Sequence, residues 1–194
     1  MSTTVRSFIA MDLPASVVCR LEDAQQGLKA LKLRAKWVRP ENIHLTLKFL
    51  GNVSAGQIDA IASAMARAVD DQPALVLALR GVGFFPGIKR ARVIWIGLGG
   101  QIQRLFALQR TLEEQLAAIG FAREKRPFKG HLTLGRIRQT VAPHVMRRIM
   151  DDYLNFSGDE FIAGRICLFQ SDLQPSGPVY SRLKQVDLNH GADF

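Results

Sequence analysis

The 194-residue sequence contains only two cysteines, Cys19 and Cys167, and this scarcity narrows the chemistry that it can support. Two cysteines cannot build a disulfide framework, and no CxxC or HxxxH spacing supplies the ligands of a zinc site. Cys19 falls in a helical pattern and Cys167 in a strand pattern, so both are interpreted as small side chains of the core. We therefore expect neither a disulfide nor a structural metal.

Long apolar runs are also missing. Residues 93–98 form one of the longest, far below the roughly 20 apolar residues that a helix needs to cross a bilayer. The first residues include Arg6 where a secretory signal would be apolar, so we expect a cytoplasmic protein without membrane contact. No GxxxxGK[ST] loop is present, which argues against a site for nucleoside triphosphates.

Positive charge, in contrast, is abundant. The chain has 26 Lys+Arg against 17 Asp+Glu, a net charge of +9, and a sequence pI near 10.2. Such an excess favours a polyanionic partner, most commonly nucleic acid. Two basic stretches, 123–129 and 89–92, are candidates for contact with a nucleic-acid backbone or are simply solvated faces.

Hydrophobic periodicity predicts a chain of mixed helices and strands. Apolar residues at helical spacing predict helices at 15–31, 58–69, 101–119 and 143–152. Extended apolar patterns predict strands at 6–13, 37–38, 43–50, 75–84, 92–98, 131–137, 161–170 and 179–186. Each half of the chain therefore repeats the order strand, helix, strand, helix, strand.

One tetrapeptide occurs twice, as His44-Leu45-Thr46-Leu47 and His131-Leu132-Thr133-Leu134, 87 residues apart. This separation is close to half the chain length, as an internal duplication would produce. We predict a single bilobal catalytic domain over 1–194, with repeats of approximately 1–85 and 91–186. The predicted fold is α+β: two pseudo-twofold-related lobes, each an antiparallel sheet with helices packed outside, and the HLTL strands facing a central cleft.

Strand geometry divides each tetrapeptide between two faces. Since successive side chains alternate, His44 shares a face with Thr46, and His131 shares one with Thr133, while the leucines point into the core. One neutral and one protonated imidazole can serve as base and acid in phosphate ester hydrolysis. The threonine hydroxyls can donate hydrogen bonds to phosphate oxygens.

With both segments in view, the chain resembles the two-histidine phosphoesterase superfamily, whose signature is a pair of His-x-Thr/Ser-x motifs in which x is usually apolar. It looks most similar to the bacterial RNA 2′,3′-cyclic phosphodiesterases, also called the 2′–5′ RNA ligase family. The similarity covers nearly the whole chain and is carried by residues 6–14, 37–51, 126–136, 171–173 and 180–183.

The resemblance implies a role for each candidate site residue. His44 and His131 would be the catalytic pair, Thr46 and Thr133 would bind phosphate oxygens, Arg136 would contact the phosphate, and Phe49 would stack on a base. Arg136 and Phe49 each follow a motif histidine by five residues. This odd offset turns them away from the histidine face unless the strand twists, bulges or ends. Without the resemblance, Phe49 is equally well interpreted as a core aromatic.

The implied activity is hydrolysis of terminal RNA 2′,3′-cyclic phosphates to 2′-phosphates by metal-free catalysis between the two histidines. ATP-independent 2′–5′ RNA ligation is a related capability of such enzymes. The expected substrates are RNA with a 2′,3′-cyclic phosphate or small cyclic nucleotides, without a cofactor, and a monomer is the default. No carboxylate cluster flanks either motif, although hard cations prefer such clusters.

Two alternatives stay open at this point. The chain could be a non-catalytic module that binds RNA ends or nucleotides, or a metal-dependent hydrolase with His44 and His131 as ligands. The sequence also leaves open which histidine is the acid and which the base, because both pKa values depend on neighbours that it does not show.

Overall fold

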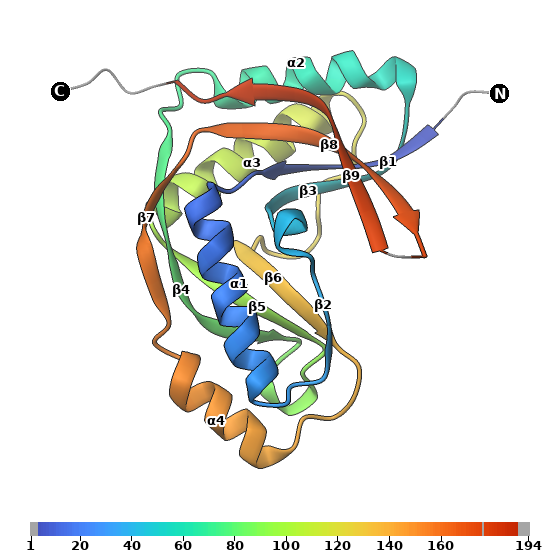
Figure 1. Cartoon of the computed structure of the whole chain (residues 1–194). Helices are drawn as coiled ribbons and strands as arrows, with labels where there is room; N and C mark the ends of the chain where they lie inside the picture. The colour runs from blue at the N-terminus through green and yellow to red at the C-terminus, as the bar shows by residue number, and fades with distance from the viewer. Residues whose placement is uncertain (1–3, 176, 190–194) are drawn as a thin grey trace.

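The computed structural model describes residues 4–175 and 177–189 (Figure 1). Its strands are β1 Thr4–Met11, β2 Ala35–Trp37, β3 Leu45–Ser54, β4 Leu75–Phe85, β5 Val93–Gly100, β6 His131–Ile137, β7 Ser157–Ala163, β8 Arg165–Gln174 and β9 Gly177–Asp187. Its helices are α1 Ala15–Ala30, α2 Ile58–Val69, α3 Ile102–Ala118 and α4 Pro143–Tyr153. None of these helices is both long enough and apolar enough to span a membrane.

The strands form one antiparallel sheet with a mirrored order. Along the sheet they run β7-β4-β5-β6-β3-β1-β8-β9, and β2 pairs with β6. At the centre, β3 meets β6 through one residue pair, Leu45 with Leu132. On the two sides of this junction, β3 corresponds to β6, β1 to β5, β8 to β4 and β9 to β7. This confirms the predicted pseudo-twofold arrangement: a first lobe of β3, β1, β8 and β9, and a second lobe of β6, β5, β4 and β7.

Each half of the chain contributes to both lobes. From the first half, β4 pairs with β5 of the second lobe, and from the second half, β8 pairs with β1 of the first lobe. The helices are divided between the lobes as well: α1 contacts β7 of the second lobe, and α3 contacts both β3 of the first lobe and β4 of the second. The helix α3 also lies beside α2 (Figure 1). Neither half therefore contains all the strands of one lobe.

The motif leucines anchor the two central strands, as predicted. Leu45, Leu47, Leu132 and Leu134 are 1%, 3%, 0% and 0% exposed and belong to the hydrophobic core. Burial of one such side chain contributes about 1.5–3 kcal/mol. The leucines thereby fix the backbone from which the histidines and threonines project.

Two predictions need correction. The predicted strand 161–170 is two strands, β7 and β8, separated at Gly164 and paired in different lobes. The apolar pattern continues across the break, so it does not reveal the change of partner. Cys167 is buried as predicted, but Cys19 is exposed. The buried stripe of α1 passes through Val17 and Leu21, and position 19 lies on the opposite side of the helix.

Candidate active site

The two motif histidines occupy matching places on β3 and β6. His131 is the first residue of β6, and His44 immediately precedes β3. The Nδ1 atom of each ring lies close to the carbonyl oxygen two residues earlier, at 2.8 Å from Asn42 and at 2.7 Å from Lys129. A carbonyl can only accept, so each Nδ1 carries the hydrogen, and Nε2 is left to take or give a proton.

Aromatic rings enclose His44. Its imidazole stacks on Phe8, with ring centroids 4.7 Å apart, and meets the edge of Tyr180 at 5.3 Å. Burial is the largest cause that lowers the pKa of His44 to about 4. The hydrogen bond to Asn42 opposes this shift, and the nearby charge of His131 lowers the pKa further. His44 is therefore neutral at physiological pH.

His131 has a similar but more open environment. Phe85 meets it edge-on with the ring centroids 4.9 Å apart, and the Nζ atom of Lys129 lies 4.6 Å from the Trp95 ring centroid. Burial again lowers the pKa, the hydrogen bond to the Lys129 carbonyl raises it, and the positive charge of Lys129 lowers it.

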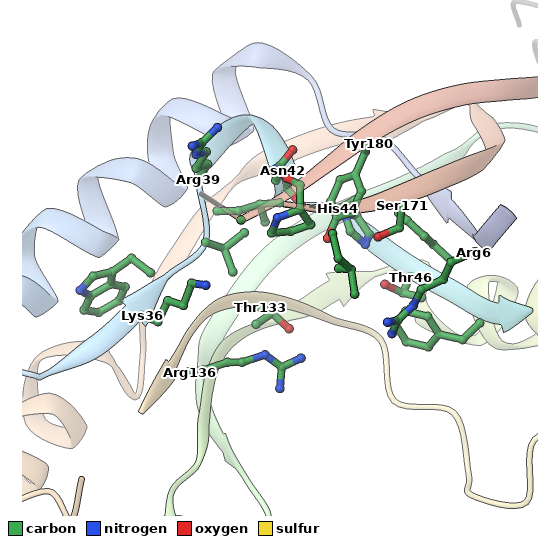
Figure 2. Close-up of a pocket in the computed structure, with 18 of the residues that line it drawn as sticks. Arg6, Lys36, Arg39, Asn42, His44, Thr46, Thr133, Arg136, Ser171 and Tyr180 are labelled. Carbon is green, nitrogen blue, oxygen red and sulfur yellow. Dashed lines mark hydrogen bonds between the residues drawn. The ribbon is translucent and has the colours of Figure 1, made fainter. Parts of the chain in front are cut away.

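A cleft of about 380 Å³ opens beside these strands (Figure 2). His44, Thr46, Phe49, Thr133 and Arg136 line it, whereas His131 is not among its lining residues and lies two residues before Thr133 on the same strand. Further cationic side chains come from Arg6, Lys36 and Arg39. None of the described lining residues is acidic, so an anion in the cleft meets positive charge and hydrogen-bond donors.

A β-bulge in β6 brings Arg136 to this cleft. Gly135 and Thr133 face consecutive residues of β5, so Leu134 is the extra residue between them. An extra residue reverses the alternation of the side chains that follow it. Arg136 consequently returns to the face of Thr133, despite its odd offset from His131.

The same irregularity occurs at the matching place in β3. The pairing of β1 with β3 skips Leu47, between Thr46 and Lys48. Phe49 therefore lies on the face of Thr46, lines the cleft and is 68% exposed. This exposure excludes the interpretation of Phe49 as a core aromatic.

Buried glutamines from two helices reach the bulges. Gln25 of α1 donates its side-chain amide to the carbonyls of Leu134 and Val38, both at 2.9 Å. Gln109 of α3 has its amide 3.4 Å from the carbonyl of Leu47. Sequence reasoning missed both glutamines, although each lies four residues after a core leucine and so on the buried stripe of its helix.

Sequence reasoning also missed several cleft residues. They are Arg6, Lys36, Arg39, Asn42, Ser171 and Tyr180. Figure 2 shows Arg6 and Ser171 on the side of Thr46, and Lys36 and Arg39 on the other side of His44. All except Lys36 fall within the segments that carry the family resemblance, and this was the signal that could have identified them. Within 4–175 and 177–189, no group of three or more His, Cys, Asp or Glu could hold a metal ion.

Comparisons with known proteins agree on one family. A family model described as "LigT like Phosphoesterase" matches residues 11–95 and again 96–180, so each match contains one HLTL segment. An RNA 2′,3′-cyclic phosphodiesterase of Archaeoglobus fulgidus is 35% identical over 182 residues, which are 93% of this chain and 98% of the relative. The protein of the same name from Thermotoga maritima is 32% identical over 187 residues, 96% of this chain and 97% of the relative. The crystal structure of E. coli LigT complexed with 3′-AMP has a TM-score of 0.79 at 28% identity, covering 97% of this chain and 100% of that one.

Proposed function

Because this chain belongs to the LigT-like phosphoesterase family, we propose that it opens the 2′,3′-cyclic phosphate at the end of an RNA and leaves a 2′-phosphate. Family membership makes it a phosphoesterase, which argues against a module that only binds. The names of its relatives support the cyclic phosphate as substrate. The observation that carries the proposal is the matched pair of histidines, each with Nδ1 held by a carbonyl and Nε2 left for proton transfer.

In this reaction the oxygen of a water molecule bonds to phosphorus, and the bond from phosphorus to the 3′ oxygen breaks. His44 Nε2 takes a proton from the water, and His131 Nε2 gives a proton to the departing 3′ oxygen. Each role contributes about 10²–10⁴-fold in rate. After product release, one proton leaves His44 for solvent and one returns to His131, which restores the starting state.

The assignment of the two roles rests on burial. A pKa of about 4 keeps His44 neutral and ready to accept a proton. His131 is more open to solvent, and an anionic phosphate beside it favours its protonated form. We therefore assign the base to His44 and the acid to His131.

Substrate binding follows from the same face. Thr46 and Thr133 donate hydroxyl hydrogen bonds to the non-bridging phosphate oxygens, and Arg136 adds positive charge where negative charge gathers. Phe49, which is exposed beside Thr46, stacks on the terminal base. We propose that neither a metal nor a cofactor takes part. The positive charge of Arg136 and the two threonine hydroxyls stabilise the phosphate in place of a metal ion.

Attack by the 5′-hydroxyl of a second RNA, in place of water, would join the two RNAs through a 2′–5′ linkage. The same P–O3′ bond breaks. Opening of the strained cyclic phosphate supplies the free energy for joining, so no nucleoside triphosphate is needed. We include this ligation in the proposal as a second use of the same two histidines.

The test uses an oligoribonucleotide with a 2′,3′-cyclic phosphate, incubated with the protein in excess chelator. Phosphorus NMR should identify a 2′-phosphate product. His44→Ala and His131→Ala should each lower kcat/KM by at least about 10²-fold, while His144→Ala, exposed on α4, should keep the parent rate. Activity that disappears in chelator and returns with added metal would support the metal-dependent alternative instead. Tight binding without turnover would support the binding module.

The arrangement of the chain belongs to this proposal as well. We take residues 1–194 to be one catalytic unit that arose by duplication of approximately 1–85 and 91–186, supported by the mirrored strand order. We expect it to act as a monomer in the cytoplasm. Light scattering and cell fractionation test these two expectations.

A further inference from the structure

A second cationic pocket lies next to the cleft. It has a volume of about 300 Å³ and is formed by the turn between β4 and β5 together with the residues after β6. Of its nine described lining residues, four are cations, Lys89, Arg90, Arg92 and Arg138, and none is acidic. These four side chains are exposed.

The positive charge of this pocket is not neutralised within the described part of the chain. The ion pairs found among residues 4–175 and 177–189 involve other cations: Lys48, Arg148, Arg165, Arg182 and Lys184. Like charges held together repel one another unless a counter-charge binds. A polyanion is the partner that this arrangement favours.

Strand pairing connects the second pocket to the cleft. Lys36 of β2 lies directly opposite Arg136 of β6, and both line the cleft. Arg138 follows Arg136 by two residues, about 7 Å along an extended chain and on the same side of it. Sheet-like pairing continues there, because the Arg138 amide donates to the Arg34 carbonyl at 3.5 Å. Lys36 and Arg136 approach the same region from two strands (Figure 2).

We propose that this row of cations, from Lys36 and Arg136 through Arg138 to the second pocket, binds the phosphodiester backbone of the substrate RNA. The second pocket would take a phosphate on the 5′ side of the terminal nucleotide. The inference rests on the proposed function, because the cyclic end lies at His44 and His131. Contacts of this kind position RNA without reading its sequence. They make RNA a better substrate than a free cyclic nucleotide.

The other basic stretch fits this role less well and provides a matched control. Glu124 lies within it, and its carboxylate accepts hydrogen bonds from the backbone amides of Lys125 and Arg126 at 2.9 Å and 3.3 Å. A negative charge is thus built into the segment 123–126. None of these residues lines the cleft or the second pocket.

The experiment compares two variants from which three charges are removed. The pocket variant carries Arg90→Gln, Arg92→Gln and Arg138→Gln, and the control variant carries Arg123→Gln, Lys125→Gln and Arg126→Gln. The substrates are adenosine 2′,3′-cyclic phosphate and a hexa-adenylate that ends in a 2′,3′-cyclic phosphate. The parent protein should prefer the hexamer by at least about tenfold in kcat/KM.

The pocket variant should lose most of that preference and hydrolyse the mononucleotide at the parent rate. Its logarithmic salt dependence on the hexamer should become less steep by about 0.7, because one phosphate contact on a single strand is lost. The control variant should resemble the parent. The inference is overturned if the pocket variant keeps the preference, if the mononucleotide rate falls equally, or if the control variant loses as much.

Direct binding separates this inference from the proposed function. A fluorescein-labelled hexa-adenylate with an ordinary 3′-hydroxyl is not hydrolysed, and its affinity is read from fluorescence anisotropy. If the parent hydrolyses neither cyclic substrate, the proposed function fails. Weaker binding of the labelled RNA to the pocket variant than to the control variant still supports RNA binding by the row of cations, and equal binding refutes it.

Discussion

Replacing the bridging 3′ oxygen of the cyclic phosphate by sulfur should separate the roles of the two histidines. A thiolate is a much better leaving group than an alkoxide and needs no proton from the enzyme. Loss of the acid is then tolerated, whereas loss of the base is not, because water must still be deprotonated. His131→Ala should therefore be rescued by the sulfur substrate, and His44→Ala should not.

The magnitude follows from the burial of His44. Lowering its pKa from the ordinary value of about 6.5 to about 4 disfavours the protonated ring by about 3 kcal/mol. At pH 7, about one free molecule in a thousand carries a proton on His44. If His44 were the acid, the free enzyme would be nearly inactive at neutral pH.

The assay measures kcat/KM for both substrates across pH. For the oxygen substrate, kcat/KM should rise with pH as His44 loses its proton near pH 4. At higher pH, kcat/KM should fall again as His131 loses its proton. This fall should come at a pH below the ordinary pKa of histidine, because burial lowers the pKa of His131. With the sulfur substrate the fall should disappear, because no acid is needed. His131→Ala, which should lose about 10²–10⁴-fold on the oxygen substrate, should recover most of that loss.

Rescue of His44→Ala instead of His131→Ala would show that the acid and base assignment is reversed. Rescue of neither variant would show that the 3′ oxygen is not the leaving group, and the product would then carry a 3′-phosphate. An acidic limb near pH 6.5 in the parent would show that burial does not perturb His44 as the structure indicates.

Three further perturbations test other parts of the site. Phe49→Ala should cost about 1–3 kcal/mol of substrate binding, seen as a similar loss of kcat/KM for adenosine and uridine cyclic phosphates; an unchanged rate would remove Phe49 from the binding surface. Gln25→Met removes the two donors that hold Val38 and Leu134. It should lower kcat/KM by up to about 10²-fold through misplacement of Arg136, with little further loss in an Arg136→Ala background; Gln115→Met, at a helical glutamine that accepts from Arg67, is the control, and additive losses would contradict the reasoning. Glu113→Gln removes the carboxylate 2.6 Å from the buried ammonium of Lys48, which keeps its hydrogen bond to the Ala122 carbonyl but loses its counter-charge. Urea denaturation should show a loss of about 3–5 kcal/mol, against at most about 1 kcal/mol for Asp152→Asn in an exposed pair; equal losses would refute the importance of burial.

Local patterns were sufficient for much of this fold. The helices α1 and α3 bury the leucines that their spacing predicts, because an amphipathic helix has few other ways to bury its apolar face. The HLTL strands were predictable for a similar reason, since strict alternation separates the buried leucines from the histidine and threonine. Each of these features depends on residues that are neighbours in sequence.

Other features depend on contacts between distant residues, and the sequence does not reveal them. Leu134 lies 109 positions from Gln25, whose amide holds its carbonyl. The bulge that turns Arg136 toward the cleft is therefore in contact with a residue far away in sequence, and strand periodicity does not predict it. The sequence also does not predict the exchange of β4 and β8 between lobes, because the apolar pattern of a strand does not specify which strand it pairs with.

The two symmetry-related strands of the site have the same pattern of burial but differ in one exposed residue. From Leu45 to Phe49, and from Leu132 to Arg136, the strands have the same order of burial: buried, intermediate, buried, buried, exposed. Phe49 and Arg136 are thus equivalent positions, one aromatic and one cationic. The proposed acid and base catalysis uses a histidine from each half, and the symmetry provides both. A nucleotide is unsymmetrical, with a base at one end and phosphate at the other, so in the proposed binding mode the difference between Phe49 and Arg136 would give the substrate one direction in the cleft.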